Sequence, residues 1–254
     1  MTLWGKRGLV VGIANAHSIA WGCARAFHDA GASLAVTYLN EKAKPFVQPL
    51  AEQIGASLIL PLDVRDDAQM SAVFDAISSR WGKLDFLLHA IAHAPKTDLE
   101  GRVVDTSREG FLSAVDVSCH SFVRMARLAE PLMSDGGCLL TTTYYGSEKV
   151  IPNYNLMGPV KAALESTVRY LAAELGPKGI RVNALSPGPI ATRAASGITH
   201  FDDLVQIALD RSPAHETACT DCVGAYATFL ASDAARLVTG SIAYVDAGFN
   251  IMGA

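Results

Sequence analysis

Short apolar runs alternate with longer amphipathic segments from one end of this chain to the other. The strand-like runs cover residues 8–12, 33–38, 57–63, 84–91, 138–143, 180–185 and 241–246, and the helical segments cover 18–30, 41–53, 66–80, 107–130, 156–175 and 220–232. Strands that are apolar almost throughout are buried on both faces, which is typical of a parallel sheet covered by helices. The alternation therefore predicts an α/β fold with a doubly wound sheet of about seven parallel strands and helices on both faces.

Length and composition favour one domain spanning residues 1–254. Half of the 254 residues are hydrophobic, so the chain can bury a large core. The formal net charge of −4 offers no electrostatic case for a nucleic-acid or anionic-membrane partner. No run approaches the ~20 apolar residues that span a bilayer. The N-terminal run lacks the layout of a signal peptide, so we expect a cytoplasmic protein.

The cysteines give no sign of a disulfide framework. The chain has 5 of them, and an odd number in a chain of this length favours a reducing compartment. Cys219-Thr-Asp-Cys222 has the spacing of a metal or redox pair, and His215 lies nearby. A structural zinc site needs four ligands, and no second pair is present. We therefore expect no metal site, and we interpret both cysteines as free thiols beside a helix that starts near Thr220.

Residues 192–212 do not fit the strand–helix alternation. The segment is too long for an ordinary connection and has only a weak helical pattern. It follows the sixth strand, which places it at the carboxyl edge of the sheet, where α/β proteins bind ligands. We predict that it is a lid over a substrate site.

The first strand runs into a turn that suits a dinucleotide phosphate. Gly12 ends the strand, and a helix begins near Ser18, so its unpaired N–H groups and positive dipole end face the turn. The three-glycine fingerprint is incomplete, because only Gly12 and Gly22 are present. The small residues Ala14, Ser18 and Ala20 still allow close approach, and Ser18 can donate to a phosphate oxygen. The alternative is a tight turn without a ligand.

Two other strand ends bear on the nucleotide. Asp63 ends the third strand, where its carboxylate can accept a hydrogen bond from an adenine amine or cap the following helix. The run Tyr38-Leu-Asn-Glu-Lys42 has neither the simple acid expected for a ribose 2′-hydroxyl nor an arginine for a 2′-phosphate. We predict NADH rather than NADPH, with Lys42 and Lys44 as the residues that would favour NADPH.

Two tyrosine–lysine pairs compete for a catalytic role. Tyr145 and Lys149 have the Tyr-x3-Lys spacing of short-chain dehydrogenases, but Gly146 makes their segment a poor helix. Lys161 instead begins a strongly amphipathic helix, which can hold it rigidly, and Tyr154 precedes it by seven positions. We choose the second pair.

Proline limits where this helix can start. Pro159 suits only a first helical turn, so the helix should begin near Leu156 and leave Tyr154 at or before its N-terminus. The alternative is a surface tyrosine beside a solvated lysine.

Four segments carry a more specific pattern: Gly12-x5-Ser18-Ile-Ala-x-Gly22; Leu62-Asp-Val64; Pro152-Asn-Tyr-Asn-x-Met-Gly158 with Lys161; and Gly188-Pro-Ile-x-Thr192 with Ala194-Ala-Ser-Gly-Ile198. Together they resemble the bacterial enoyl-acyl-carrier-protein reductases, divergent members of the short-chain dehydrogenase superfamily. The resemblance covers essentially the whole chain. It implies a Rossmann-like domain, a homotetramer, and reduction of the trans-2 double bond of an enoyl thioester by NADH in fatty acid biosynthesis.

The resemblance also implies roles for individual residues. Tyr154 would bind the thioester carbonyl, Lys161 the nicotinamide ribose, and Tyr144 and Ala94 would line the substrate pocket. The cofactor would contact Gly12, Ser18, Ile19, Leu39, Asp63, Val64, Ile91, Lys161, Ile190 and Thr192. The lid at 192–212 would order over cofactor and substrate, and the acyl chain would arrive on acyl carrier protein.

Some positions depart from the family. His93 stands where an aromatic or apolar residue is usual, and we interpret it as a partly exposed loop histidine rather than a titrating group at the pocket mouth. Ala92, Pro187 and Leu39 also differ, which bears on cofactor preference and chain length. The competing functions are a carbonyl-reducing dehydrogenase with the same cofactor and a non-catalytic nucleotide-binding protein.

Overall fold

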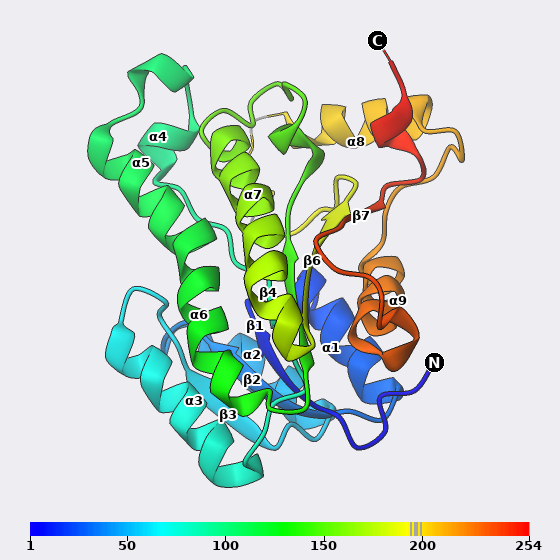
Figure 1. The fold of residues 1–254 in the computed structure, drawn as a ribbon. Coiled ribbons are helices and arrows are strands. Elements are labelled where there is room, and N and C mark those ends of the chain that lie inside the picture. The colour runs from blue at the N-terminus through cyan, green and yellow to red at the C-terminus, as the bar shows by residue number, and fades with distance from the viewer. Residues whose placement is uncertain (194, 196–197, 199, 254) are drawn as a thin grey trace.

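Seven parallel strands form one sheet in the order β3-β2-β1-β4-β5-β6-β7 (Figure 1). The computed structural model describes residues 1–193, 195, 198 and 200–253, and these counts refer to them. The strands are β1 (Arg7–Val11), β2 (Ser33–Tyr38), β3 (Leu58–Pro61), β4 (Phe86–His89), β5 (Gly137–Thr142), β6 (Ile180–Pro187) and β7 (Ile242–Val245). The predicted seven-stranded doubly wound sheet is confirmed, and both ends of every strand lie within two residues of the predicted run.

Helices cover both faces of the sheet, as the apolar strands predict (Figure 1). One face carries α1 (Ile19–Asp29), α2 (Lys44–Gln53) and α9 (Thr220–Ala231), and the other carries α3 (Asp67–Trp81), α6 (Ser121–Ala129) and α7 (Met157–Leu175). Within β1, Leu9 and Val11 enter one hydrophobic core and Val10 enters the other. Alternating burial explains why these strands are apolar at nearly every position.

Three further helices lie above the carboxyl edge of the sheet: α4 (Lys96–Leu99), α5 (Arg108–Val115) and α8 (Phe201–Arg211) (Figure 1). The predicted helix over 107–130 is present as α5 and α6 joined by a π-helical turn, Asp116–His120. The weak pattern of 192–212 conceals α8, a regular helix of 11 residues with only Leu204 and Ala208 buried. So little buried surface explains why the sequence signals this helix poorly.

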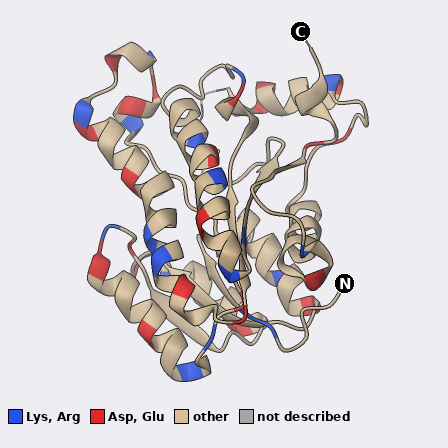
Figure 2. Cartoon of the chain, viewed as in Figure 1, with Lys and Arg blue, Asp and Glu red and all other residues tan. Residues whose placement is uncertain are grey.

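Acidic and basic residues are interspersed over the outer helices, while the strands are almost wholly uncharged (Figure 2). Among the described residues, no helix combines the length and the apolar character that crossing a membrane would require.

Candidate active site

A cavity of about 550 Å³ opens at the carboxyl edge of the sheet. Its walls come from the segments that follow β1, β4, β5 and β6, together with the start of α7 and part of α8. Ten of the thirteen predicted site residues line it: Gly12, Ser18, Ile19, Ile91, Ala94, Tyr144, Tyr154, Lys161, Ile190 and Thr192. The other three, Leu39, Asp63 and Val64, lie outside it.

The turn after β1 is shaped for close approach by a ligand. Gly12 has φ +112°, and a Cβ built there would lie 2.1 Å from the carbonyl oxygen of Ala90, so only glycine fits. The Ser18 hydroxyl oxygen accepts hydrogen bonds from the backbone N–H groups of Ala14 and Asn15, both at 3.0 Å. Its own hydrogen is directed at Asn15 Oδ1, 3.4 Å away. Ser18 therefore stabilises the turn and leaves the first N–H groups of α1 without helical acceptors.

The three predicted residues that lie outside the cavity follow β2 and β3. Asp63 is held by Arg65, with Oδ1–Nε 3.0 Å and Oδ2–Nη2 2.6 Å, and this hydrogen-bonded guanidinium lowers the pKa of the Asp63 carboxyl. The helix-capping alternative for Asp63 is wrong, because Asp66 caps α3 by accepting from two backbone N–H groups. Val64 is buried in the core, and Leu39 is 51% exposed after β2.

The lysines that would have favoured NADPH lie beyond β2. Lys44 pairs with Glu41 at 3.5 Å and lies 5.5 Å from the centre of the Tyr38 ring. Lys42 is exposed. Neither lines the cavity.

Tyr154 is positioned by an irregular turn, as Pro159 predicts. The helix α7 begins at Met157, and Tyr154 lies between Asn153 (φ 64°) and Asn155 (φ 42°), both in the left-handed region. Asn155 ties the turn to the α4 segment by donating from Nδ2 to the carbonyl oxygen of Leu99 at 2.8 Å. The tyrosine is thus held by tertiary contacts rather than by the helix.

The two cavity tyrosines pack edge to face, with ring centroids 4.9 Å apart. Tyr154 is 7% exposed, and burial raises its pKa well above the ordinary range. Burial and the nearby Asp246 raise the pKa of Tyr144 to about 12. Both phenols therefore stay protonated near neutral pH and can act as hydrogen-bond donors. The Tyr154 ring packs on Gly146, where a Cβ would lie 2.5 Å from Cδ1 of the ring.

Lys161 is also buried and lines the cavity. Its ammonium donates to the carbonyl oxygen of Thr142, at the end of β5, over 2.8 Å. Burial lowers the pKa of Lys161 to about 8, and Glu165 opposes part of that shift. One helical turn further along, Glu165 accepts from the hydroxyls of Thr143 (2.6 Å) and Ser147 (2.5 Å). The site thus contains a carboxylate that the sequence reasoning missed, although its i,i+4 spacing from Lys161 on one helix face was a signal.

A second missed residue is His89, at the end of β4. Its ring is fully buried, with Nδ1 2.9 Å from Thr141 Oγ1 and Nε2 2.8 Å from Ser121 Oγ. Burial, with a smaller effect from Lys161, lowers its pKa to about 3, so the imidazole is neutral. It supports the segment that leads to Ile91, which lines the cavity.

The competing tyrosine–lysine pair lies elsewhere. Tyr145 is buried against Tyr244 and Phe249, with ring centroids 6.3 and 6.0 Å away, and does not line the cavity. Lys149 is exposed. The structure therefore brings Tyr154 and Lys161 to one cavity and keeps Tyr145 and Lys149 out of it.

The predicted lid borders the cavity through the residues that the structure describes. Thr192, Ala195, Ile198, Phe201 and Leu204 contribute to the wall. The Thr192 hydroxyl accepts from the backbone N–H of Ala195 at 3.2 Å. Ala194, Ser196 and Gly197 of the predicted lid motif, and Thr199, lie outside the described residues. His93 is exposed, as the loop-histidine interpretation expects, and it also borders the cavity.

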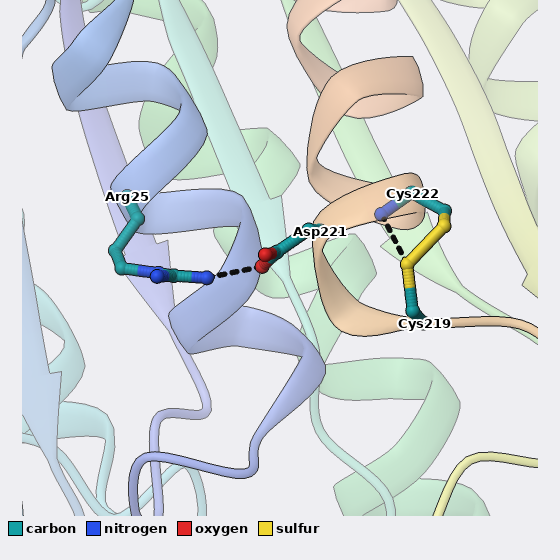
Figure 3. The surroundings of a disulfide bond; sticks show 4 residues. All are labelled: Arg25, Cys219, Asp221 and Cys222. Carbon is teal, nitrogen blue, oxygen red and sulfur yellow. Dashed lines mark hydrogen bonds and ion pairs between the residues drawn. A yellow bond between two sulfur atoms is a disulfide. The ribbon is translucent and has the colours of Figure 1, made fainter.

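The interpretation of Cys219 and Cys222 as free thiols is wrong. The two form a disulfide at the start of α9, with their Cα atoms 5.2 Å apart (Figure 3). The i,i+3 geometry of a helix start brings the two side chains together, and the Cys-x2-Cys spacing is compatible with this bond. The odd number of cysteines had argued against any disulfide, so the bond was not predicted. Across the described residues, no group of three or more His, Cys, Asp or Glu side chains is placed to hold a metal ion.

Comparisons with known proteins agree with this geometry. A family model described as "Enoyl-(Acyl carrier protein) reductase" matches residues 12–250. Enoyl-[acyl-carrier-protein] reductase [NADH] 2 of Rhizobium meliloti (strain 1021) is 50% identical over 97% of this chain and 92% of its own length. The NADH-dependent enzyme FabI of Synechocystis sp. is 48% identical over 100% of this chain and 99% of its own.

Solved structures resemble the chain equally well. An enoyl-acyl-carrier-protein reductase from Anaplasma phagocytophilum in complex with NAD has a TM-score of 0.96 and 46% identity, covering 100% of this chain and 97% of that one. The Bacillus cereus reductase with NADP+ and indole naphthyridinone has a TM-score of 0.97 and 46% identity, with 100% coverage of both chains.

Proposed function

The chain belongs to the enoyl-(acyl carrier protein) reductase family, and we propose that Tyr154 and Lys161 carry its chemistry at the cavity described above. Its reaction is the NADH-dependent reduction of the trans-2 double bond of an enoyl thioester on acyl carrier protein, a step of fatty acid synthesis. The observation that carries the assignment of residues is the convergence of a buried phenol and a buried ammonium on one cavity.

The cavity suits the NADH that the reaction needs. The Gly12 turn leaves no room for a side chain, and the N-terminus of α1 offers N–H groups to a pyrophosphate. Ser18, Ile19, Ile91, Ile190 and Thr192 are proposed as the remaining contacts along this wall. Bound there, NADH supplies the hydride that is added to the β-carbon of the enoyl group.

The adenosine half is proposed to extend over the neighbouring strands. Tyr38 pairs with Pro61 at the carboxyl ends of β2 and β3, so Leu39 and Asp63 follow the same edge of the sheet as Gly12. An ionised Asp63 carboxylate can accept a hydrogen bond from an adenine amine, and Val64 supports this loop from within the core. Leu39 offers an apolar contact in place of the usual polar one.

Tyr154 is proposed as the donor to the thioester oxygen. Addition of hydride to the β-carbon moves negative charge onto that oxygen, and a donor that binds the enolate more strongly than the ground state accelerates the reaction. Among the described residues, the Tyr154 hydroxyl has no hydrogen-bond partner. It is therefore available to donate to substrate. Lys161 is proposed to bind the nicotinamide ribose and, through its positive charge, to stabilise the enolate as well.

The acyl chain is proposed to lie against the apolar part of the wall. Ala94, Tyr144 and Met157 border the cavity beside Tyr154, and Ile198 and Phe201 face it from the lid segment. In this proposal residues 1–254 are one domain, and residues 192–212 close over the bound ligands. Closure would exclude water from the enolate and strengthen the hydrogen bond from Tyr154.

Assembly as a homotetramer in the cytoplasm is also part of the proposal. Exposed apolar side chains on α5 and α7, including Leu112 at 54% and Tyr170 at 71%, suit contacts between subunits. Sedimentation equilibrium tests the tetramer, and a monomeric enzyme with full activity would contradict it. Cell fractionation tests the location.

The function is tested by comparing two thioesters of equal length. Crotonyl and acetoacetyl thioesters are each incubated with the purified chain and NADH, and the loss of nicotinamide absorbance is followed. We expect turnover of the crotonyl substrate only. Turnover confined to the acetoacetyl substrate would overturn the proposal in favour of a carbonyl reductase.

A further inference from the structure

The Cys219–Cys222 disulfide differs from the other cysteines in its accessibility. Both of its cysteines are exposed, whereas Cys23, Cys119 and Cys138 are buried and free. The bond lies at the first turn of α9 (Figure 3). A reductant in solution can therefore reach this disulfide without opening the fold.

The bond is poorly suited to be a structural cross-link. The stabilisation from a disulfide grows with the length of the loop that it closes, and this one closes a ring with only two residues between its cysteines. The first turn of α9 is also held by other contacts, since the Asp221 carboxylate pairs with Arg25 of α1. Disulfides in reducing compartments are usually transient and catalytic or redox-sensing. The proposed cytoplasmic location therefore favours a reversible bond.

The geometry of the helix start favours attack by an external thiolate on one particular sulfur of the disulfide. The backbone N–H of Cys222 donates to Cys219 Sγ at 3.0 Å, and Cys219 is the N-cap of α9. This hydrogen bond and the helix dipole stabilise a thiolate at Cys219, which makes it the better leaving group. An external thiolate would thus attack Cys222 Sγ.

The disulfide also lies behind the cofactor cavity. Ala218, next to Cys219, packs on Gly188 of the cavity wall, 3.4 Å from the position of a Cβ. On the other side, the backbone of Thr220 packs so closely on Gly22 of α1 that a Cβ there would lie 2.5 Å from the Thr220 carbonyl oxygen. The helix α1 begins at Ile19, which lines the cavity. A change at residues 219–222 therefore reaches two parts of the cavity wall through direct contacts.

We propose that Cys219 and Cys222 are a reversible thiol–disulfide exchange site, reduced by an external dithiol, and that its redox state changes the affinity for NADH. One thiolate of the dithiol attacks Cys222 Sγ, forms a mixed disulfide and releases Cys219 as a thiolate. The second thiolate then attacks the dithiol's own sulfur in that bond and releases Cys222. Two electrons pass to the chain, both cysteines take up protons, and the dithiol becomes a disulfide.

Thiol labelling with mass spectrometry tests the site itself. The folded chain is treated with N-ethylmaleimide before and after a dithiothreitol step, and labelled peptides are identified. We expect no label before reduction and label on Cys219 and Cys222 alone afterwards, because the other three cysteines are buried. Label before reduction, absence of label after it, or simultaneous labelling of the buried cysteines would each overturn the proposal.

The NADH titration tests the effect on the cavity. We expect the dissociation constant for NADH to be severalfold higher for the reduced chain than for the oxidised chain. The same increase is expected for the chain that carries both Cys219→Ser and Cys222→Ser, because residues 218–220 lose the constraint of the disulfide. The affinity of the double variant should not respond to dithiothreitol, which controls for effects elsewhere. Equal affinity for NADH in both redox states would refute the proposed effect of the disulfide on the cavity. This arm rests on the proposed cofactor site, so a chain that binds no NADH in either state would refute that function while the labelling result stands.

Discussion

Replacement of Tyr154 by phenylalanine removes one oxygen atom from the cavity and changes little else. The ring packs edge to face on Tyr144 and against Gly146, and phenylalanine keeps both contacts. The described residues offer the Tyr154 hydroxyl no hydrogen-bond partner, so the variant breaks no bond within the fold. We therefore expect the free energy of unfolding to stay within about 1 kcal/mol of the parent value.

The expected effect on catalysis is much larger. The loss of one preorganised donor to a developing oxyanion typically lowers kcat by roughly 10² to 10³, or about 3–4 kcal/mol of transition-state stabilisation. Lys161 keeps its hydrogen bond to Thr142 in this variant, so the KM for NADH should not change. The signature is a loss in kcat with stability and cofactor affinity preserved.

Steady-state assays with crotonyl thioester, together with thermal melts, measure these quantities. Tyr145→Phe is the matched control, because Tyr145 is also 7% exposed but does not line the cavity. Its kcat should equal that of the parent chain. Full activity of Tyr154→Phe, with the loss appearing in Tyr144→Phe instead, would refute the assignment of the donor.

Four further predictions concern the lysines and the glycine turn. Lys161→Ala should weaken NADH binding at least tenfold in a fluorescence titration, because the buried ammonium lines the cavity, whereas Lys149→Ala should leave it unchanged; a larger effect at Lys149 would reverse the choice of pair. The pKa of Lys161 near 8 means that the free enzyme loses this charge as pH rises through about 8, so kcat/KM for NADH should fall on the alkaline side, and Lys161→Arg should move that fall to higher pH. The folded chain also releases this proton before an unfolded lysine does, so the contribution of Lys161 to the free energy of unfolding should rise between about pH 8 and about pH 10.4, as melts across that range would reveal. Gly12→Ala places a Cβ 2.1 Å from the Ala90 carbonyl oxygen, so it should abolish NADH binding and lower the melting temperature. Gly55→Ala is the control, because Gly55 has φ +57° but open space around it. Its free energy of unfolding should fall by only about 1–2 kcal/mol in the same melts.

The sheet was predictable because its signal is local and repeated. Each strand is buried on both faces, so each is apolar almost throughout and stands out from the amphipathic helices between them. The end of β1 and the start of α7 were predictable from single residues, Gly12 and Pro159. Glycine tolerates positive φ, and proline lacks the N–H that a helix interior needs. The α8 helix was not predictable in the same way, because it buries only Leu204 and Ala208.

The lining of the cavity was predictable where chemistry and chain order agreed. Ten predicted residues line one cavity because the carboxyl ends of parallel strands meet at one edge of the sheet. Glu165 and His89 were missed, because a buried charged or titratable group is recognised only when its partners are known. The Cys219–Cys222 bond was missed because its spacing fits free thiols and a disulfide equally.

The class of fold, the order of its elements and the residue types that the chemistry requires were all predictable from the sequence. These depend on short-range patterns: the period of apolar residues, the φ preference of glycine and the missing N–H of proline. Helix placement in the sequence already favoured Tyr154 and Lys161, but the burial of Lys161 against Thr142 and the bond between Cys219 and Cys222 beside the cavity wall appear only in the folded chain. These outcomes depend on contacts between segments far apart in the chain, and on the burial that shifts a pKa, neither of which a local pattern contains.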